Sequence, residues 1–464
     1  MNLLYIHTHD TGRCISPYGY AVDTPNFQRF CDDAMLFERA HSVASICSPS
    51  RACLFTGTYP HQNGMLGLAQ RGFEIRSELH MARLLASCGY RTALCGVQHE
   101  VGYYTDHEQG AAVLGYELDL TADVSPYAER ELVAWDCRNA ERLSSWIRSN
   151  RDERPFFVSF GMHATHRAYP LESDTGRIKR SVPPCNAPNT PETRADYAGF
   201  CRSVHMADEC LGIVLSALID SGSYDDTLIV LTTDHGIAYP FAKSTLLDAG
   251  TGVLLAIRVP GAARMRGVCD ALVSHIDVLP TVLELLDIEA PTYLEGVSFA
   301  RLFSGEEFRG DGAVFGSMNF HTSYEPARSV RTERYAYIRR FDAEYTGINC
   351  SNIDDSPVKE WYREQGLLNR EKPSELLFDL ACDRFETNNL ATDAAYLGVL
   401  DEMRELLTSH LIETNDPILK GPIAVQSNWK VNAPQCYSAH SKNPSDYISI
   451  GSGICNASVR REED

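Results

Sequence analysis

The sequence has no long uninterrupted apolar run and no basic leader at its start. The apolar stretch at residues 2–6 is far shorter than the roughly 20 residues that a membrane-spanning helix needs. A secretory signal peptide has a basic first region and a small-residue cleavage site, and the opening residues, MNLLYIHTHD, have neither. We therefore expect no membrane partner and a cytoplasmic location.

Basic residues are scarce relative to acidic ones. The chain has 42 Lys and Arg against 62 Asp and Glu, which gives a net charge of −20. Such a charge argues against nucleic acid and anionic membranes as main partners, and it disfavours long polyanionic glycans as substrates. A short anionic ligand in a locally positive pocket remains compatible with it.

Cysteine, in contrast, is abundant, with 15 residues scattered over 464. The number is odd and the spacings do not form close pairs, so the pattern is not that of a disulfide framework. We expect mostly free thiols, as in a reducing cytosol.

Strand-like and helix-like segments alternate through the first two thirds of the chain. Short apolar runs predict buried strands, and apolar residues at helical spacing predict the helices between them. The strand candidates are residues 3–8, 35–41, 91–95, 156–160, 227–232 and 253–259, and the helix candidates are 78–87, 197–218, 278–286 and a segment that begins at Pro25. This order is typical of a parallel sheet with helices on both faces.

The pattern changes near residue 310. Residues 313–317, 327–332 and 335–340 are strand candidates in succession, and the next long helix is expected only at 396–410. We therefore divide the chain into a large α/β domain at 1–310 and a smaller α+β domain on an antiparallel sheet at 311–464. The residues from about 417 onward, rich in Ser, Asn, Pro and Gly, predict an irregular tail.

The strongest chemical signal is the sequence Cys47-Ser48-Pro49-Ser50-Arg51. Pro49 has no N–H to donate and suits the first turn of a helix, which places Cys47 at a helix N-terminus that favours an anion. Arg51 adds a fixed guanidinium for a tetrahedral oxyanion. The alternative is a buried structural cysteine before a helix, since cysteine is often buried.

Other polar groups follow strand candidates, at the edge where ligand sites gather in open α/β sheets. Asp234 and His235 are a good pair of metal ligands, although a strand-ending Asp beside a surface His is the alternative. We expect His7 to be a core residue. The other groups are residues 7–10, 162–167 and 243–250.

Together these motifs resemble the type I sulfatases of the alkaline-phosphatase superfamily. Residues 47–51 match that family's C-x-P-x-R maturation motif, and further matching segments follow in the family's order at 58–64, 234–236, 243–250, 274–281, 328–332 and 375–380. The likeness spans about residues 2–390, and residues 157–167 look most like heparan N-sulfatases (N-sulfoglucosamine sulfohydrolases). It implies a large, mixed, mostly parallel sheet sandwiched by helices.

The resemblance also implies hydrolysis of a sulfate ester or sulfamate of a small sulfated amino sugar, in glycosaminoglycan degradation. A formylglycine-generating maturation enzyme would oxidise Cys47 to formylglycine, whose hydrate attacks sulfur. A divalent cation, calcium or else magnesium or manganese, would be held by Asp10, Asp234, His235 and His9. The remaining implied residues are the catalytic Arg51, His99, His166 and Lys243 and the substrate-binding Gln98, His163 and Arg167.

Within that set the resemblance assigns separate tasks. Arg51 would steady the sulfate, while Lys243 and His166 would hold the sulfate and its leaving oxygen or nitrogen. His99 would take the proton when the sulfated hydrate collapses.

Two positions depart from the family pattern. Val97 replaces the lysine of G-K-x-H, and Gln98 can supply only a weaker, uncharged hydrogen bond. His9 stands where the family has Asp, which removes a carboxylate from a site for calcium, a cation that prefers oxygen ligands. A phosphodiester or phosphonate-monoester hydrolase of the same superfamily and a non-catalytic sulfated-glycan binder therefore stay open, and a homo-oligomer is compatible with the sequence.

Overall fold

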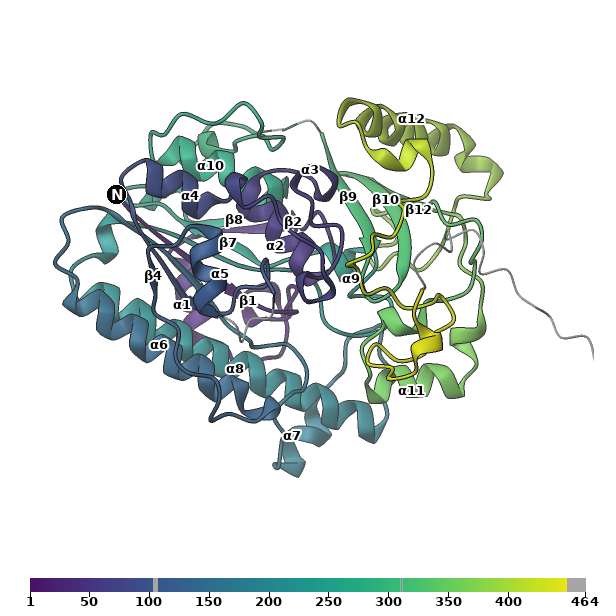
Figure 1. The fold of residues 1–464 in the computed structure, drawn as a ribbon, viewed down its shortest axis with the longest axis horizontal. Coiled ribbons are helices and arrows are strands. Elements are labelled where there is room, and N and C mark those ends of the chain that lie inside the picture. Colours follow the sequence, from purple (N-terminus) through teal and green to yellow (C-terminus); the bar gives the residue numbers. More distant parts are fainter. Residues whose placement is uncertain (103–106, 309, 311, 449–464) are drawn as a thin grey trace, which may run out of the picture.

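The chain forms a large sheet covered by helices and a smaller sheet beside it (Figure 1). The computed structural model describes residues 1–102, 107–308, 310 and 312–448. The part of the predicted tail beyond residue 448 lies outside these residues.

The large sheet has eight strands in the order β4-β3-β5-β1-β6-β7-β2-β8. Its centre is β1 (Asn2–Thr8), which runs parallel to β5 (Phe156–Gly161) on one side and β6 (Thr227–Thr233) on the other. The sheet is mixed because β7 runs antiparallel to both of its neighbours. The other strands are β2 (Met35–His41), β3 (Arg91–Gly96), β4 (Leu118–Asp119), β7 (Leu255–Arg258) and β8 (Gly267–Ser274). The predicted mixed, mostly parallel sheet is confirmed.

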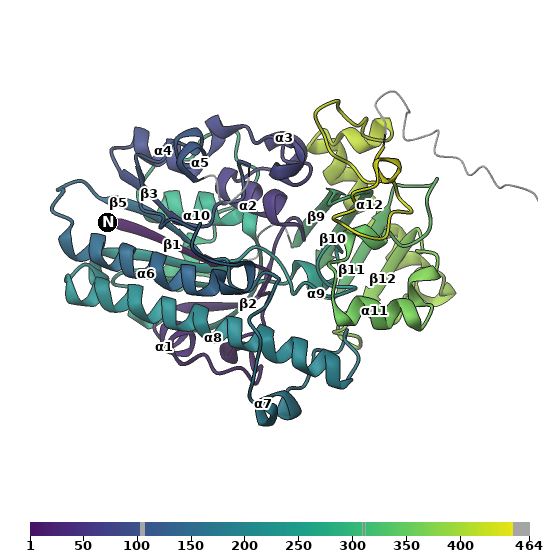
Figure 2. The ribbon, with the colours of Figure 1, turned by 60° about the horizontal axis from the view of Figure 1, so that its bottom comes forward.

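Helices cover both faces of this sheet, as Figures 1 and 2 show. One face packs against α1 (Pro25–Asp32), α6 (Leu132–Ser149) and α8 (Pro191–Asp220), and α6 and α8 lie side by side along it. The opposite face packs against α2 (Cys47–Thr56), α4 (Met81–Ser87), α5 (His107–Leu114) and α10 (Val278–Leu285). The shorter helices are α3 (Pro60–Asn63), α7 (Thr175–Arg180) and α9 (Asp248–Thr251).

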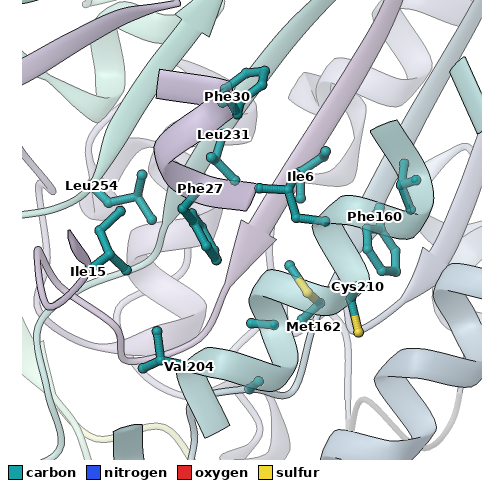
Figure 3. Close-up of a cluster of buried hydrophobic side chains, with 14 of the residues drawn as sticks. Ile6, Ile15, Phe27, Phe30, Phe160, Met162, Val204, Cys210, Leu231 and Leu254 are labelled. Atoms are coloured by element: carbon teal, nitrogen blue, oxygen red, sulfur yellow. The ribbon is translucent and has the colours of Figure 1, made fainter. Parts of the chain in front are cut away.

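The two cores follow from the alternation of side chains along a strand. In β1, Leu4 and Ile6 enter the core under α1, α6 and α8, whereas Leu3 and Tyr5 enter the core under α2 and α10. Figure 3 shows Ile6 and, from α1, Phe27 among the side chains of the first of these cores. Each such buried aliphatic or aromatic side chain stabilises the fold by about 1.5–3 kcal/mol, so the central strand is held firmly from both sides.

The smaller sheet is antiparallel, as predicted, with the order β12-β11-β10-β9. Its strands are β9 (Ala313–Phe320), β10 (Tyr324–Thr332), β11 (Tyr335–Arg340) and β12 (Glu375–Asp379), and its helices are α11 (Pro357–Glu364) and α12 (Leu397–Glu413). Leu400, Met403 and Leu407 of α12 pack on this sheet against Val330 and Tyr337. All strands of the large sheet precede residue 310 in the sequence, and all strands of the smaller sheet follow it. A domain boundary at this residue stays a prediction.

Several elements differ from the sequence-based expectation. The helix expected at 78–87 is interrupted, because a 3-10 turn at Ser77–Leu79 ends at His80, whose ring accepts a hydrogen bond from the Ala82 N–H and so begins α4. The strand expected at 253–259 is shorter and antiparallel, and β4, β8 and α6 were not expected. All cysteines in the described part of the chain are free thiols, and no helix there is long and apolar enough to span a bilayer.

Candidate active site

Polar residues follow the three adjacent parallel strands β5, β1 and β6 at the same edge of the large sheet. The register pairs His7 of β1 with Gly161 of β5 and with Thr232 of β6, so the residues that follow these strands lie at one level. His9 and Asp10 follow β1, Asp234 and His235 follow β6, and His163 follows β5. This is the carboxyl edge of a largely parallel sheet, where ligand sites form.

Cys47 is the first residue of α2 and lies directly above this edge. Its side chain is buried, with Sγ 3.3 Å from His235 Nε2 and 3.9 Å from Asp10 Oδ1. Burial raises the pKa of the Cys47 thiol well above its usual value, an effect that Lys243 only partly opposes. The unmodified thiol is therefore protonated and a poor nucleophile at neutral pH.

The carboxylates of Asp10 and Asp234 lie close to the Cys47 sulfur, and a hydrogen bond links the two residues. The Asp10 backbone N–H donates to Asp234 Oδ1 at 2.8 Å, and Asp10 has a φ of 59°, in the left-handed region that Asp tolerates better than most residues. His235 Nε2 lies 3.2 Å from Asp10 Oδ1, and His9 Nε2 lies 3.3 Å from Asp234 Oδ2. Two carboxylates and two imidazoles thus point at one volume.

This donor set fits a divalent cation. Donor atoms of His9, Asp10, Asp234 and Cys47 all lie within 4.8 Å of one another. Both ring nitrogens of His9 lack a hydrogen-bond partner among the described residues although the side chain is fully buried, a cost that a metal ligand would not incur. Burial opposes ionisation of both aspartates, but nearby positive groups outweigh it and hold both pKa values below their usual value, so each carboxylate is ready to bind a cation.

Two buried cations complete the polar centre. Arg51 places Nη2 3.1 Å and Nε 3.2 Å from Asp234 Oδ2, and its Nη1 contacts the ring of His7. Lys243 Nζ donates to Asp10 Oδ2 at 2.8 Å and lies 2.9 Å from Asp354 Oδ2. Burial alone would lower the pKa of Lys243, but Asp10 and Asp354 raise it well above its usual value. Both cations are therefore charged beside the sulfur of Cys47.

Four imidazoles line one side of the centre. The ring of His9 lies 4.6 Å from that of His166, 5.6 Å from that of His99 and 6.4 Å from that of His163, measured between centroids. The Nε2 atom of His99 lies 2.9 Å from Gln70 Oε1, which fixes the ring. Burial lowers the pKa values of His9, His99 and His163 well below the usual value, so these rings are neutral.

Two of the expected substrate-binding residues, Gln98 and Arg167, form hydrogen bonds with other parts of the protein. The Gln98 side chain donates to Val101 O at 2.7 Å and accepts from the backbone N–H groups that follow it, so it fixes its own loop. Arg167 forms a two-pronged ion pair with Asp196 at 2.6 and 2.8 Å. The other expected site residues lie around Cys47, His9 and the two carboxylates.

The site residues that sequence inspection did not find come from loops without a motif. Asp354 reaches Lys243 from the segment between β11 and α11, and Gln70 fixes His99 from a turn after α3. Val97, at which the resemblance led us to expect a lysine, is fully buried against Trp135 and Leu132.

Comparison with known proteins gives consistent results. The Sulfatase family model matches residues 2–288, and the model for the C-terminal region of N-sulphoglucosamine sulphohydrolase matches residues 234–368. The chain is 29% identical to human N-sulphoglucosamine sulphohydrolase, over 91% of each chain. Among solved structures it resembles a 2-O GAG sulfatase (TM-score 0.71, 20% identity, 92% of this chain and 95% of that one). It also resembles a protein solved with its substrate D-glucosamine-2-N,6-O-disulfate (TM-score 0.69, 17% identity, 89% and 98%).

Proposed function

Because the chain belongs to the sulfatase family, whose enzymes hydrolyse sulfate esters and sulfamates, we propose that it removes sulfate from a small sulfated amino sugar. The observation that carries this proposal is the position of Cys47, buried between two carboxylates and two cations at a helix N-terminus. The human relative is named for N-sulfated glucosamine, and the structure with a bound glucosamine disulfate has a similar fold. Both favour an amino sugar as the substrate.

Charge neutralisation on the sulfate falls to Arg51 and Lys243. Arg51 contacts Asp234 and Lys243 contacts Asp10, and both carboxylates lie within 4.8 Å of the Cys47 sulfur. A tetrahedral anion placed there meets a guanidinium and an ammonium, and preorganised donors of this kind commonly contribute a factor of about 10²–10³ to the rate.

A divalent cation would be held by Asp10, Asp234, His235 and His9. Calcium is the first choice and magnesium or manganese the alternatives, because two of the four ligands are carboxylates. Such a cation supplies a Lewis acid that polarises the sulfate and the attacking hydroxyl. Lys243 then serves both Asp10 and the sulfate, and it stays in place because Asp354 holds it from the other side.

Cys47 would be converted to formylglycine by a maturation enzyme. Hydrated formylglycine would supply a hydroxyl as the nucleophile. The protonated thiol of unmodified Cys47 cannot serve in this role. One nitrogen of His99 lies within 4.8 Å of the Cys47 sulfur and its ring is neutral, so His99 is placed to take a proton from that position. The ring of His166 lies beside those of His9 and His163, and His166 would protonate the leaving oxygen or nitrogen.

The test is sulfate release from glucosamine sulfates and 4-nitrophenyl sulfate by Cys47→Ala, after co-expression with a maturation enzyme. We expect turnover to disappear while the melting temperature stays within a few degrees. Cys53→Ala, on the same buried helix, is the matched control and should keep its activity. Mass spectrometry of the Cys47 peptide should show formylglycine in the active protein.

Two results would overturn the proposal. Faster cleavage of aryl phosphonate esters than of any sulfate would make the chain a phosphonate hydrolase. An unmodified Cys47 together with tight binding of sulfated sugar and no turnover would make it a binding protein.

A further inference from the structure

Asp354 is the acidic residue that the smaller domain brings to the site. Its Oδ2 atom lies 2.9 Å from Lys243 Nζ. The side chain of Asp354 is 19% exposed, whereas those of Lys243 and Asp10 are 4% and 0% exposed. Asp354 therefore lies between the buried centre and the solvent, where a sugar ring would enter.

The loop that carries Asp354 is fixed on both sides of it. On one side the Asn352 side chain accepts a hydrogen bond from the Thr322 N–H at 3.0 Å, which ties the loop to the turn between β9 and β10. The ammonium of Lys359, whose side chain is fully buried, donates to Ile353 O at 2.9 Å and to Asp355 Oδ1 at 2.7 Å, and so ties the residues before and after Asp354. The carboxylate is therefore held in place before any ligand arrives.

This carboxylate is charged. Burial would raise the pKa of Asp354, but Lys243 and His321 together hold it below its usual value. A carboxylate has about four acceptor positions, and the contact with Lys243 uses one of them. The remaining positions suit a hydroxyl or an ammonium donor, and the negative charge repels a second sulfate or a carboxylate.

We infer that Asp354 accepts a hydrogen bond from a hydroxyl or amino group of the sulfated ring and selects rings that carry one anionic group over rings that carry two. The inference rests on the proposed function and names a substrate preference for the same site. An aryl sulfate has no such donor, so its hydrolysis depends on Asp354 only through the contact with Lys243. This difference separates recognition of the sugar from chemistry on the sulfate.

The experiment compares wild type, Asp354→Asn and Asp355→Asn on D-glucosamine N-sulfate, D-glucosamine N,6-O-disulfate and 4-nitrophenyl sulfate. Asp355 is the matched control because it is adjacent and 52% exposed, and its contact is with Lys359 rather than Lys243. We expect Asp354→Asn to lower kcat/KM on the monosulfate by roughly tenfold or more, the usual loss for a hydrogen bond to a charged group. Its kcat/KM on the disulfate should fall less, so the preference for the monosulfate narrows. Its rate on 4-nitrophenyl sulfate should fall clearly less than its rate on the monosulfate, because only the support that Asp354 gives Lys243 is lost there. All rates of Asp355→Asn should change by less than about threefold.

Each other outcome has a defined meaning. An equal loss on 4-nitrophenyl sulfate would show that Asp354 acts only by positioning Lys243, and equal losses in Asp355→Asn would show a general effect of the loop. Unchanged preference between the two glucosamine sulfates would also overturn the inference. If Asp354→Asn melts more than about 5 °C below wild type, Asp354→Glu, which keeps the charge, should keep the preference for the monosulfate. Failure of the wild type on every sulfate would instead reject the proposed function.

Discussion

Replacing His9 with aspartate tests the proposed cation site. His9 Nε2 lies 3.3 Å from Asp234 Oδ2 and 3.8 Å from Asp10 Oδ1. Burial, with a further contribution from Arg51, lowers the pKa of His9 well below its usual value, so the native ligand is neutral. His9→Asp would add a third negative charge to the pocket and would replace a nitrogen donor with the oxygen that calcium prefers.

The size of the effect follows from the spacing. Two unit charges about 4 Å apart in an effective dielectric constant of about 20 interact by about 4 kcal/mol. Without a cation, the new carboxylate is repelled by each neighbouring aspartate with about this energy. A doubly charged cation at the same distance would attract the new carboxylate about twice as strongly. Since Arg51 and Lys243 neutralise part of this effect, we expect a gain of at least about 1.4 kcal/mol, which is a tenfold increase in affinity for Ca²⁺.

The assay is thermal unfolding over a series of Ca²⁺ and Mn²⁺ concentrations, with bound metal measured by elemental analysis. His9→Asp should melt below wild type without metal and gain more from Ca²⁺ than wild type does, because a ligand at 100 times its Kd stabilises the folded state by about 2.7 kcal/mol. His9→Asn is the control, since it offers an amide oxygen without the charge. If His9→Asp binds Ca²⁺ no better than His9→Asn, a negative charge at position 9 does not raise the affinity for Ca²⁺, and the prediction is wrong.

Three further substitutions test separate parts of the structure. Lys243→Met should lower kcat for sulfate release by about 10²–10³, and a loss below tenfold would count against its assigned role. The pKa of His80 is lowered to about 3 by burial, so its neutral form stabilises the fold, and the free energy of unfolding should fall as pH drops below about 6.5, by up to about 1.4 kcal/mol per pH unit. In His80→Asn, the new side chain can still accept a hydrogen bond from the Ala82 N–H. The free energy of unfolding of this variant, measured by urea unfolding, should therefore fall less between pH 7 and pH 5 than that of the wild type. Arg328→Met should reduce the free energy of unfolding by about 3–5 kcal/mol because it strands the buried Asp416, which the guanidinium contacts at 2.6 and 3.0 Å, and a loss under 1 kcal/mol would contradict this.

The central strands were predictable because burial on both faces produces continuous apolar runs. β1, β5 and β6 each end within about one residue of the expected position. β8 was missed because it is an edge strand, largely solvent-exposed along its first half, with charged and polar residues among its apolar ones. The direction of β7 could not be inferred, since an apolar run has the same composition whichever way the strand runs.

The same distinction applies to the site. Cys47, Asp10 and Asp234 stand in local motifs at strand or helix ends, and short-range patterns therefore predicted their meeting. Asp354 joins Lys243 across more than 100 positions, in a stretch with no motif, and only the folded chain brings the two together. The ion pair between Arg167 and Asp196 likewise joins residues that no local motif connects.

Substrate size is the last property that the structure bears on. The reacting position is enclosed, with Cys47 1% and Lys243 5% exposed, and Asp354, which contacts Lys243, is more exposed than either. A terminal sugar can enter such a site, whereas an internal sugar of a polymer would have to bring both neighbouring rings with it. The net charge of −20 adds a long-range repulsion that grows with the number of sulfates on the substrate.

We therefore expect kcat/KM for a sulfated disaccharide to exceed that for intact heparan sulfate by at least about tenfold, measured as sulfate release per accessible end. The screening length falls from about 30 Å at 0.01 M salt to about 10 Å at 0.1 M, so added salt should narrow the part of this gap that is electrostatic and leave the steric part. Equal efficiency on the polymer at either salt concentration would refute the expectation. A gap that closes completely with salt would mean that charge alone, and not the enclosed position of Cys47, keeps long chains out.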